Sequence, residues 1–83
     1  SPLHIAVEKN KDLVIIENLL KLSNIDANLK NRMGDTPLFL AATQQKEGPC
    51  RLISLHPTSQ MSQKEMERIM GLRNGRRIVE VIQ

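Results

Sequence analysis

Cys50 and His56 are residues whose types could carry out a reaction, because a thiol beside an imidazole can act as a nucleophile with its base. They lie six positions apart in a segment that contains Pro49 and Pro57, and no third residue that would orient the histidine is evident. His4 is a further potential ligand, but the spacing of one cysteine and two histidines fits no closed zinc site. We therefore interpret Cys50 and His56 as loop residues and predict no metal.

Paired carboxylates and a phosphate-binding loop are the other features that would indicate an enzyme. Glu65 and Glu67 begin a predicted helix, and Glu65 is better explained by a capping box with Ser62. The four glycines are scattered and form no phosphate loop. The sequence thus predicts neither catalysis nor a cofactor.

The basic residues gather in the second part of the chain. Residues 1–48 hold six Lys/Arg and six Asp/Glu, whereas residues 49–83 hold six Lys/Arg against three Glu. The local cluster consists of Lys64, Arg68, Arg73, Arg76 and Arg77. Phosphate contacts are one interpretation, but no aromatic residue is available for base stacking. A solvated helix end is favoured, with docking onto an acidic protein patch as the next alternative.

A repeat organises the elements that position these residues. The segment from Ser1 to Val7 returns as the segment from Thr36 to Ala42, at an offset of 35 residues. Each copy opens with a hydroxyl residue that can cap a helix, followed by a proline at the first helical position. A repeat of this period predicts stacked helix pairs, and it favours binding over catalysis.

Apolar spacing and turn residues predict the other elements of the first unit. The first helix ends near Asn10, and a second helix capped by Asp12 ends at Ser23-Asn24. Met33-Gly34 supplies the positive φ of a turn at the tip of a hairpin-like finger, and the next helix follows Thr36-Pro37.

The second unit departs from this pattern. Gly48-Pro49 and His56-Pro57 interrupt it, and a helix capped by Ser62 is stopped by Asn74-Gly75. Residues 76–83 then read as a delayed second helix, so that residues 46–74 are expected to be a helical insertion. Three methionines of this insertion are expected to pack it onto the stack, namely Met61, Met66 and Met70.

Composition indicates the compartment. Cys50 is the only cysteine, whereas a small secreted domain normally needs disulfides. No signal peptide or membrane span is evident. We expect an intracellular protein, cytoplasmic or nuclear.

The repeated motifs resemble those of ankyrin-repeat proteins. Ser1 to Ala6 and Thr36 to Ala41 resemble the Thr-Pro-Leu-His-x-Ala run of that family, and residues 31–38 resemble its Asp-x-x-Gly-x-Thr-Pro-Leu hairpin. The resemblance implies an all-α, ankyrin-type helix-turn-helix solenoid with a β-hairpin-like finger between repeats. It implies one repeat at 1–30, which lacks its first finger, and a second at 31–83, which contains the insertion at about 46–74 and is truncated at its C-terminus.

In this family the fingers and first helices bind proteins, so the resemblance implies a protein–protein interaction module. Carried over residue by residue, the contact positions are Arg32, Met33 and Asp35 on the finger, Thr43 and Gln44 on the following helix, and Glu8 and Lys9 on the first helix. The histidine of the Thr-Pro-Leu-His-x-Ala run, here His4, is expected to hydrogen-bond to the neighbouring turn.

Three alternatives remain: a regulatory scaffold that docks through residues 46–74, a targeting arm of a larger enzyme, and nucleic-acid binding by the arginine cluster. We also expect part of a longer array that self-associates through uncovered apolar ends. The apolar residues expected at those ends are Leu13, Val14, Leu19, Val79 and Ile82. The sequence does not identify the protein partner.

Overall fold

The computed structural model describes residues 1–9, 11–22 and 24–82. Their helices are α1 (Pro2–Glu8), α2 (Leu13–Leu20), α3 (Pro37–Thr43), α4 (Glu47–Ser54), α5 (Gln63–Met70) and α6 (Gly75–Ile82). These residues contain no β-strand, which confirms the all-α prediction. The predicted roles of Asn10 and Ser23 as helix ends, and of Gln83 as the end of the last helix, lie outside the described residues.

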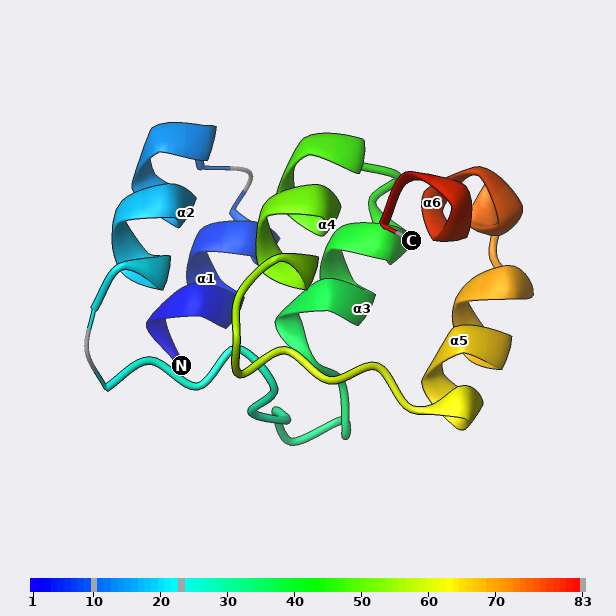
Figure 1. Ribbon diagram of the computed structural model, residues 1–83, viewed down its shortest axis with the longest axis horizontal. Helices are drawn as coiled ribbons and strands as arrows, with labels where there is room; N and C mark the ends of the chain where they lie inside the picture. The colour runs from blue at the N-terminus through cyan, green and yellow to red at the C-terminus, as the bar shows by residue number, and fades with distance from the viewer. Residues whose placement is uncertain (10, 23, 83) are drawn as a thin grey trace.

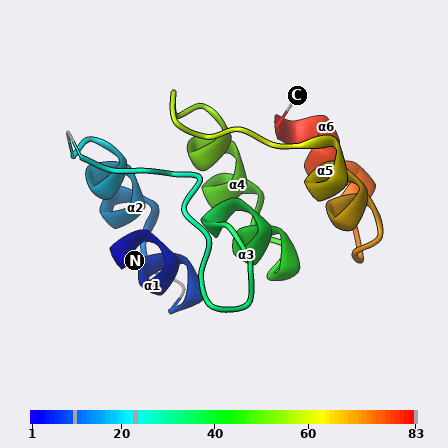
Figure 2. The same ribbon diagram turned by 90° about the horizontal axis from the view of Figure 1, so that it is seen from below.

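The helices form three pairs, α1–α2, α3–α4 and α5–α6, that lie side by side along the longest axis of the molecule (Figure 1). Within the stack α1 contacts α3 and α3 contacts α5, while α2 contacts α4 and α4 contacts α6. The view from below shows α1 and α3 in one row and α2 and α4 in another (Figure 2). The overall dimensions are 31 × 22 × 21 Å.

The first helix of each pair begins at a hydroxyl side chain. Ser1, Thr36 and Ser62 each accept a hydrogen bond from the backbone N–H three residues further on, at 3.3, 3.2 and 3.1 Å. Such caps satisfy N–H groups that have no partner inside the helix. All three predicted caps are thus confirmed. Asp12 stands at the capping position of α2 but makes no side-chain capping bond there.

The position of α4 differs from the expectation. The sequence predicts no second helix in this unit before residue 76, yet α4 begins at Glu47 and packs against α2 and α3. The turn between the two helices has the same hydrogen bond in both pairs. Lys11 N–H donates to Ala6 O at 3.0 Å in the first pair, and Lys46 N–H donates to Ala41 O at 3.1 Å in the second. Both residues of the second bond lie 35 positions after those of the first, so the repeat continues into α4.

Pro49 explains why the sequence pattern is misleading here. It occupies the first turn of α4, where a proline is tolerated because those N–H groups lack helical partners anyway. Cys50 and Ile53 follow it and are fully buried. In the first pair Ile16 of α2 is buried in the same core. We therefore propose a division into three helix pairs in place of an insertion at 46–74.

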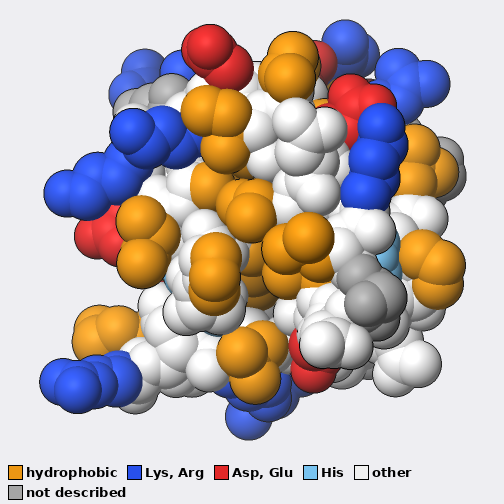
Figure 3. All heavy atoms as spheres, turned by 90° about the vertical axis from the view of Figure 1, so that its left-hand side faces the viewer, with side chains coloured by type: hydrophobic (Ala, Val, Ile, Leu, Met, Phe, Trp, Pro, Cys, Tyr) orange, Lys and Arg blue, Asp and Glu red, His pale blue; other side chains and the backbone are white. Residues whose placement is uncertain are grey.

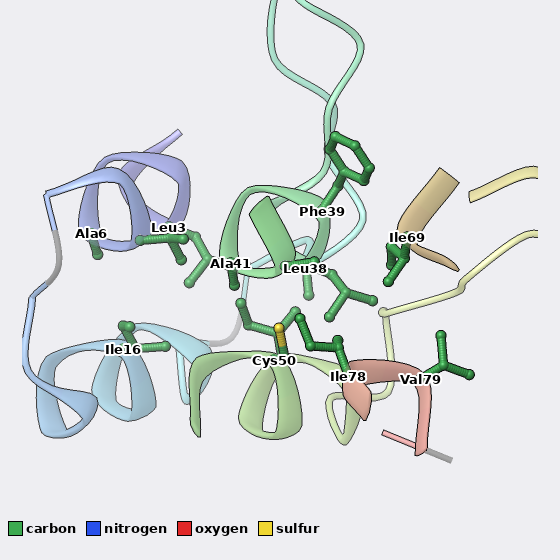
Figure 4. Packing of buried hydrophobic residues seen from close by; sticks show 14 residues of the cluster. Leu3, Ala6, Ile16, Leu38, Phe39, Ala41, Cys50, Ile69, Ile78 and Val79 are labelled. Carbon is green, nitrogen blue, oxygen red and sulfur yellow. The ribbon is translucent and has the colours of Figure 1, made fainter. Parts of the chain in front are cut away.

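The core runs between the two rows of helices and includes residues from every helix (Figure 4). Leu3 and Ile16 lie at one end of it, Leu38, Ala41 and Cys50 at the centre, and Ile69, Ile78 and Val79 at the other end (Figure 4). Met61 and Met66 are half-buried and pack against this core, as predicted, whereas Met70 is mostly outside it with 43% of its surface exposed.

The α1–α2 end of the stack is apolar. Figure 3 faces this end, and hydrophobic side chains cover its middle. The large apolar residues exposed on these helices are Ile5, Leu13, Val14 and Ile15. The expectation of an apolar edge is therefore confirmed for Leu13 and Val14. It is wrong for Val79, which is buried because it packs into the core at the α5–α6 end.

Gly75 is needed where α6 passes the end of α5. A methyl group on Gly75 would lie 1.7 Å from the carbonyl oxygen of Ile69. The prediction that Asn74-Gly75 ends α5 is therefore wrong. Gly71 caps α5, Asn74 takes the left-handed conformation with φ 59°, and Gly75 starts α6.

We predict that Gly75→Ala lowers the free energy of unfolding by about 2–4 kcal/mol, because backbone atoms must move to admit the methyl group. Gly71→Ala is the matched control. Its methyl group would meet the carbonyl oxygens of Arg68 at 3.5 Å and Glu67 at 3.7 Å, which are ordinary contacts, so stability should stay within about 0.5 kcal/mol. Urea unfolding followed by circular dichroism measures both; equal effects of the two substitutions would contradict the close approach.

Candidate protein-binding surface

The turn at residues 31–35 is closed by the side chain and backbone of Asn31. Its Oδ1 accepts hydrogen bonds from the N–H groups of Met33 and Asp35, both at 2.9 Å. Its backbone N–H donates to Asp35 O at 2.9 Å, and its carbonyl accepts from Gly34 N–H at 3.0 Å. Gly34 has φ 79°, which glycine adopts without strain. This 31–35 turn occupies the expected finger, but the β-hairpin part of that expectation is not confirmed.

Helix α1 holds the 31–35 turn from one side. His4 is buried, and its Nε2 lies 2.9 Å from the backbone oxygen of Asp35. Because a carbonyl only accepts, Nε2 carries the proton, and Nδ1 then accepts from the Ser1 hydroxyl at 2.7 Å. The predicted bond between His4 and the neighbouring turn is confirmed.

Helix α5 holds the same turn from the other side. The Arg68 guanidinium forms an ion pair with the Asp35 carboxylate, with Nη2 and Oδ1 2.9 Å apart. It also stacks over the Phe39 ring, 3.9 Å from the centroid, which fixes its position further. In addition, the Thr36 hydroxyl donates to the Glu65 carboxylate. No pattern in the sequence indicates these three contacts.

Arg32 and Met33 are the exposed residues of this turn. Met33 has 81% of its surface exposed, and Arg32 is exposed with no hydrogen bond or ion pair to any residue that the structure describes. Asp35 differs from them: only 15% of its side chain is exposed, and Arg68 occupies its carboxylate. Asp35 therefore positions the turn, and Arg32 and Met33 are the side chains available to a partner.

The other predicted contact residues lie at the far ends of α1 and α3. Thr43 is exposed and its hydroxyl donates to Leu40 O at 2.6 Å. Gln44 donates from Nε2 to Glu8 O at 3.3 Å, which joins the ends of the two helices. Glu8 and Lys9 are exposed beside it. The seven residues of α3 separate this group from the 31–35 turn by about 10 Å, so the structure forms two areas and not one.

The arginine cluster does not form one surface. Arg68 is bound to Asp35, and Arg77 pairs with Glu47 of α4 at 3.0 Å. The hydrogen bond that Arg77 donates to Glu47, together with the negative charge of Glu47, raises the pKa of Arg77. Arg73 and Arg76 are exposed. The cluster is thus divided between ion pairs within the stack and solvated side chains.

Cys50 and His56 do not form a reactive pair. Cys50 is fully buried in α4, and the loss of solvent around it, together with the charge of Glu47, raises the pKa of its thiol to about 12. His56 lies beyond the end of α4, and its Nδ1 is bound to the Thr58 hydroxyl at 2.8 Å. Within the described residues no group of three or more His, Cys, Asp or Glu side chains is arranged to hold a metal ion.

Stacked helix pairs of this kind define a class of repeat scaffold in which each pair is stabilised by its neighbours. Comparison with known proteins places the chain within that class. Residues 1–32 match the family model for the ankyrin repeat, which supports an ankyrin-repeat protein, and the helix pairs described above are consistent with ankyrin-type helical repeats. No curated protein and no solved structure matches the chain. Across the described residues no helix has the length and hydrophobicity required to cross a membrane.

The Cys50 thiol gives a test of the core at high pH. The unfolded thiol has a pKa near 8.5, below the folded value of about 12. The unfolded state therefore loses its proton first, so the contribution of Cys50 to stability is complete below about pH 8.5 and is lost as the pH rises toward 12. We predict that unfolding free energies measured between pH 7 and 10.5 fall more steeply for the wild type than for Cys50→Ala. Parallel slopes would show that this thiol ionises as easily in the folded as in the unfolded protein.

Proposed function

We propose that this protein is a scaffold that binds a protein partner, with Arg32 and Met33 of the 31–35 turn as its principal contacts. Ankyrin repeats are generally protein–protein interaction modules and are typically non-enzymatic. The observation that carries the proposal is the combination of a fixed backbone and free side chains at this turn. Asp35 is bound to both α1 and α5, while Arg32 and Met33 are exposed.

This arrangement suits recognition energetically. A turn that is already ordered loses little conformational entropy when a partner binds. Arginine and methionine are enriched at protein interfaces, since they combine a long apolar stem with a charged or polarisable end. In Figure 2 the part of this connection that precedes α3 bends between α1 and α3, on the side away from α2 and α4. The end residues Glu8, Lys9, Thr43 and Gln44 form the second contact area of the proposal.

An intracellular location belongs to the same proposal. It is supported by the free thiol of Cys50, which is buried and has no disulfide partner. Docking through residues 46–74 as a protruding insertion has less support, because α4 and α5 are packed into the stack.

We predict that Arg32→Glu weakens partner binding about tenfold or more, as expected for the loss of an interface arginine. The immobilised protein would be exposed to an extract of the cells that produce it, and captured proteins would be quantified by mass spectrometry. Arg51→Glu is the control, because Arg51 is exposed on α4 and the charge change is the same. Both variants should unfold like the wild type.

The contradictory result is a set of captured proteins that Arg32→Glu retains in full. The proposal would also be wrong if Arg51→Glu lost the same proteins to the same degree, because net charge and not the 31–35 turn would then determine capture.

A further inference from the structure

A polar cleft of about 270 Å³ lies next to the 31–35 turn, where the connection into α3 meets the start of α5. The connections 24–36 and 55–62 both run along this end of the helices (Figure 1). Lys30 and Gly34 line the cleft from the first connection, and Ser62 lines it at the cap of α5. The two connections are tied together, since the Thr58 hydroxyl accepts from Ala27 N–H at 2.8 Å.

The charge of the cleft is positive. Lys30, Lys64 and Arg68 line it against a single carboxylate, that of Glu65. Lys30 and Lys64 are exposed and form no ion pair with any other residue in the described part of the chain. Glu65 is engaged by the Thr36 hydroxyl. Even when the nearby Asp35 is counted as the partner of Arg68, two ammonium groups face one carboxylate.

Arg68 is fixed in this cleft more firmly than a surface arginine usually is. It is held by Asp35 at 2.9 Å and by the Phe39 ring at 3.9 Å. A guanidinium has five N–H donors. The hydrogen bond to Asp35 Oδ1 uses one of them, on Nη2. Because the guanidinium is already held in place, its remaining N–H groups can donate to a carboxylate without a change of side-chain conformation. This favours recognition of planar anions. The start of α5 adds the positive end of its helix dipole.

We propose that this cleft binds an acidic segment of a protein partner, with Asp or Glu carboxylates held between Lys30, Lys64 and Arg68. The size of the cleft suits one or two side chains. Nucleic acid is disfavoured because none of the residues that line the cleft is aromatic, so it offers no surface on which a base could stack. Carboxylates can instead share the hydroxyl and amide donors that line the cleft beside the three cations.

The inference deepens the proposed function and rests on it, because it names the chemistry of the partner that the 31–35 turn would meet. The two can fail separately. Lys30 and Lys64 flank the cleft, whereas Arg32 belongs to the exposed turn. Loss of partner capture by Arg32→Glu without any binding of acidic peptide would overturn the inference and leave the proposed function standing.

The test measures fluorescence anisotropy of a fluorescein-labelled hexaglutamate peptide titrated with the full chain at low salt. We expect saturable binding that weakens at least about threefold between 20 and 200 mM salt. The double substitution Lys30→Glu with Lys64→Glu should weaken it about tenfold or more, since two attractions become repulsions. Hexaglutamine with the same label should not bind.

The matched control is the double substitution Arg73→Glu with Arg76→Glu, which makes the same change in net charge at exposed residues outside the cleft. It should leave the affinity within about twofold. The proposal is overturned if this control weakens binding equally, or if hexaglutamine binds as well as hexaglutamate. It is also overturned if a labelled hexathymidine oligonucleotide binds more tightly and depends on Lys30 and Lys64, because the cleft would then be a phosphate site.

Discussion

Asp35 connects the 31–35 turn to α1 and α5. Its backbone oxygen accepts from His4 of α1, its backbone N–H donates to Asn31, and its carboxylate pairs with Arg68 of α5. Hydrogen bonds that involve a charged group are among the stronger ones, and each is favoured further when it is partly shielded from water. One residue thus fixes the turn to α1 of the first pair and to α5 of the third pair. The exposure of Arg32 and Met33 and the walls of the cleft both follow from that position.

The helices require such links because they are short. None exceeds eight residues in the described part of the chain, and isolated helices of that length are not stable in water. Each pair is ordered by its neighbours, through a core of aliphatic side chains between the two rows. The consequence is visible at the α1–α2 end, where Val14 has 66% of its surface exposed. A surface of that kind is the expected site of contact with another protein chain or repeat.

The sequence predicts the local chemistry of this fold well. A hydroxyl residue followed by helical spacing locates the starts of α1, α3 and α5, and Met33-Gly34 locates the turn, because caps and positive φ depend on single residue types. The start of α4 is not predicted, since Gly48-Pro49 looks like a break until its position in the first helical turn is known. Contacts between distant residues are also missed. Nothing in the spacing of Arg68 indicates that it meets Asp35 and Phe39, because that depends on how the third pair packs.

The most direct test of the central claim is the backbone order of the 31–35 turn, measured by ¹⁵N relaxation at the amides of Met33, Gly34 and Asp35. If Asp35 fixes the turn through His4 and Arg68, the order parameters should be near 0.85, the value of rigid backbone, and fall toward 0.6 in Arg68→Ala. Order parameters below about 0.6 in the wild type, or values unchanged by Arg68→Ala, would contradict the account, because the turn would not then be held by the stack.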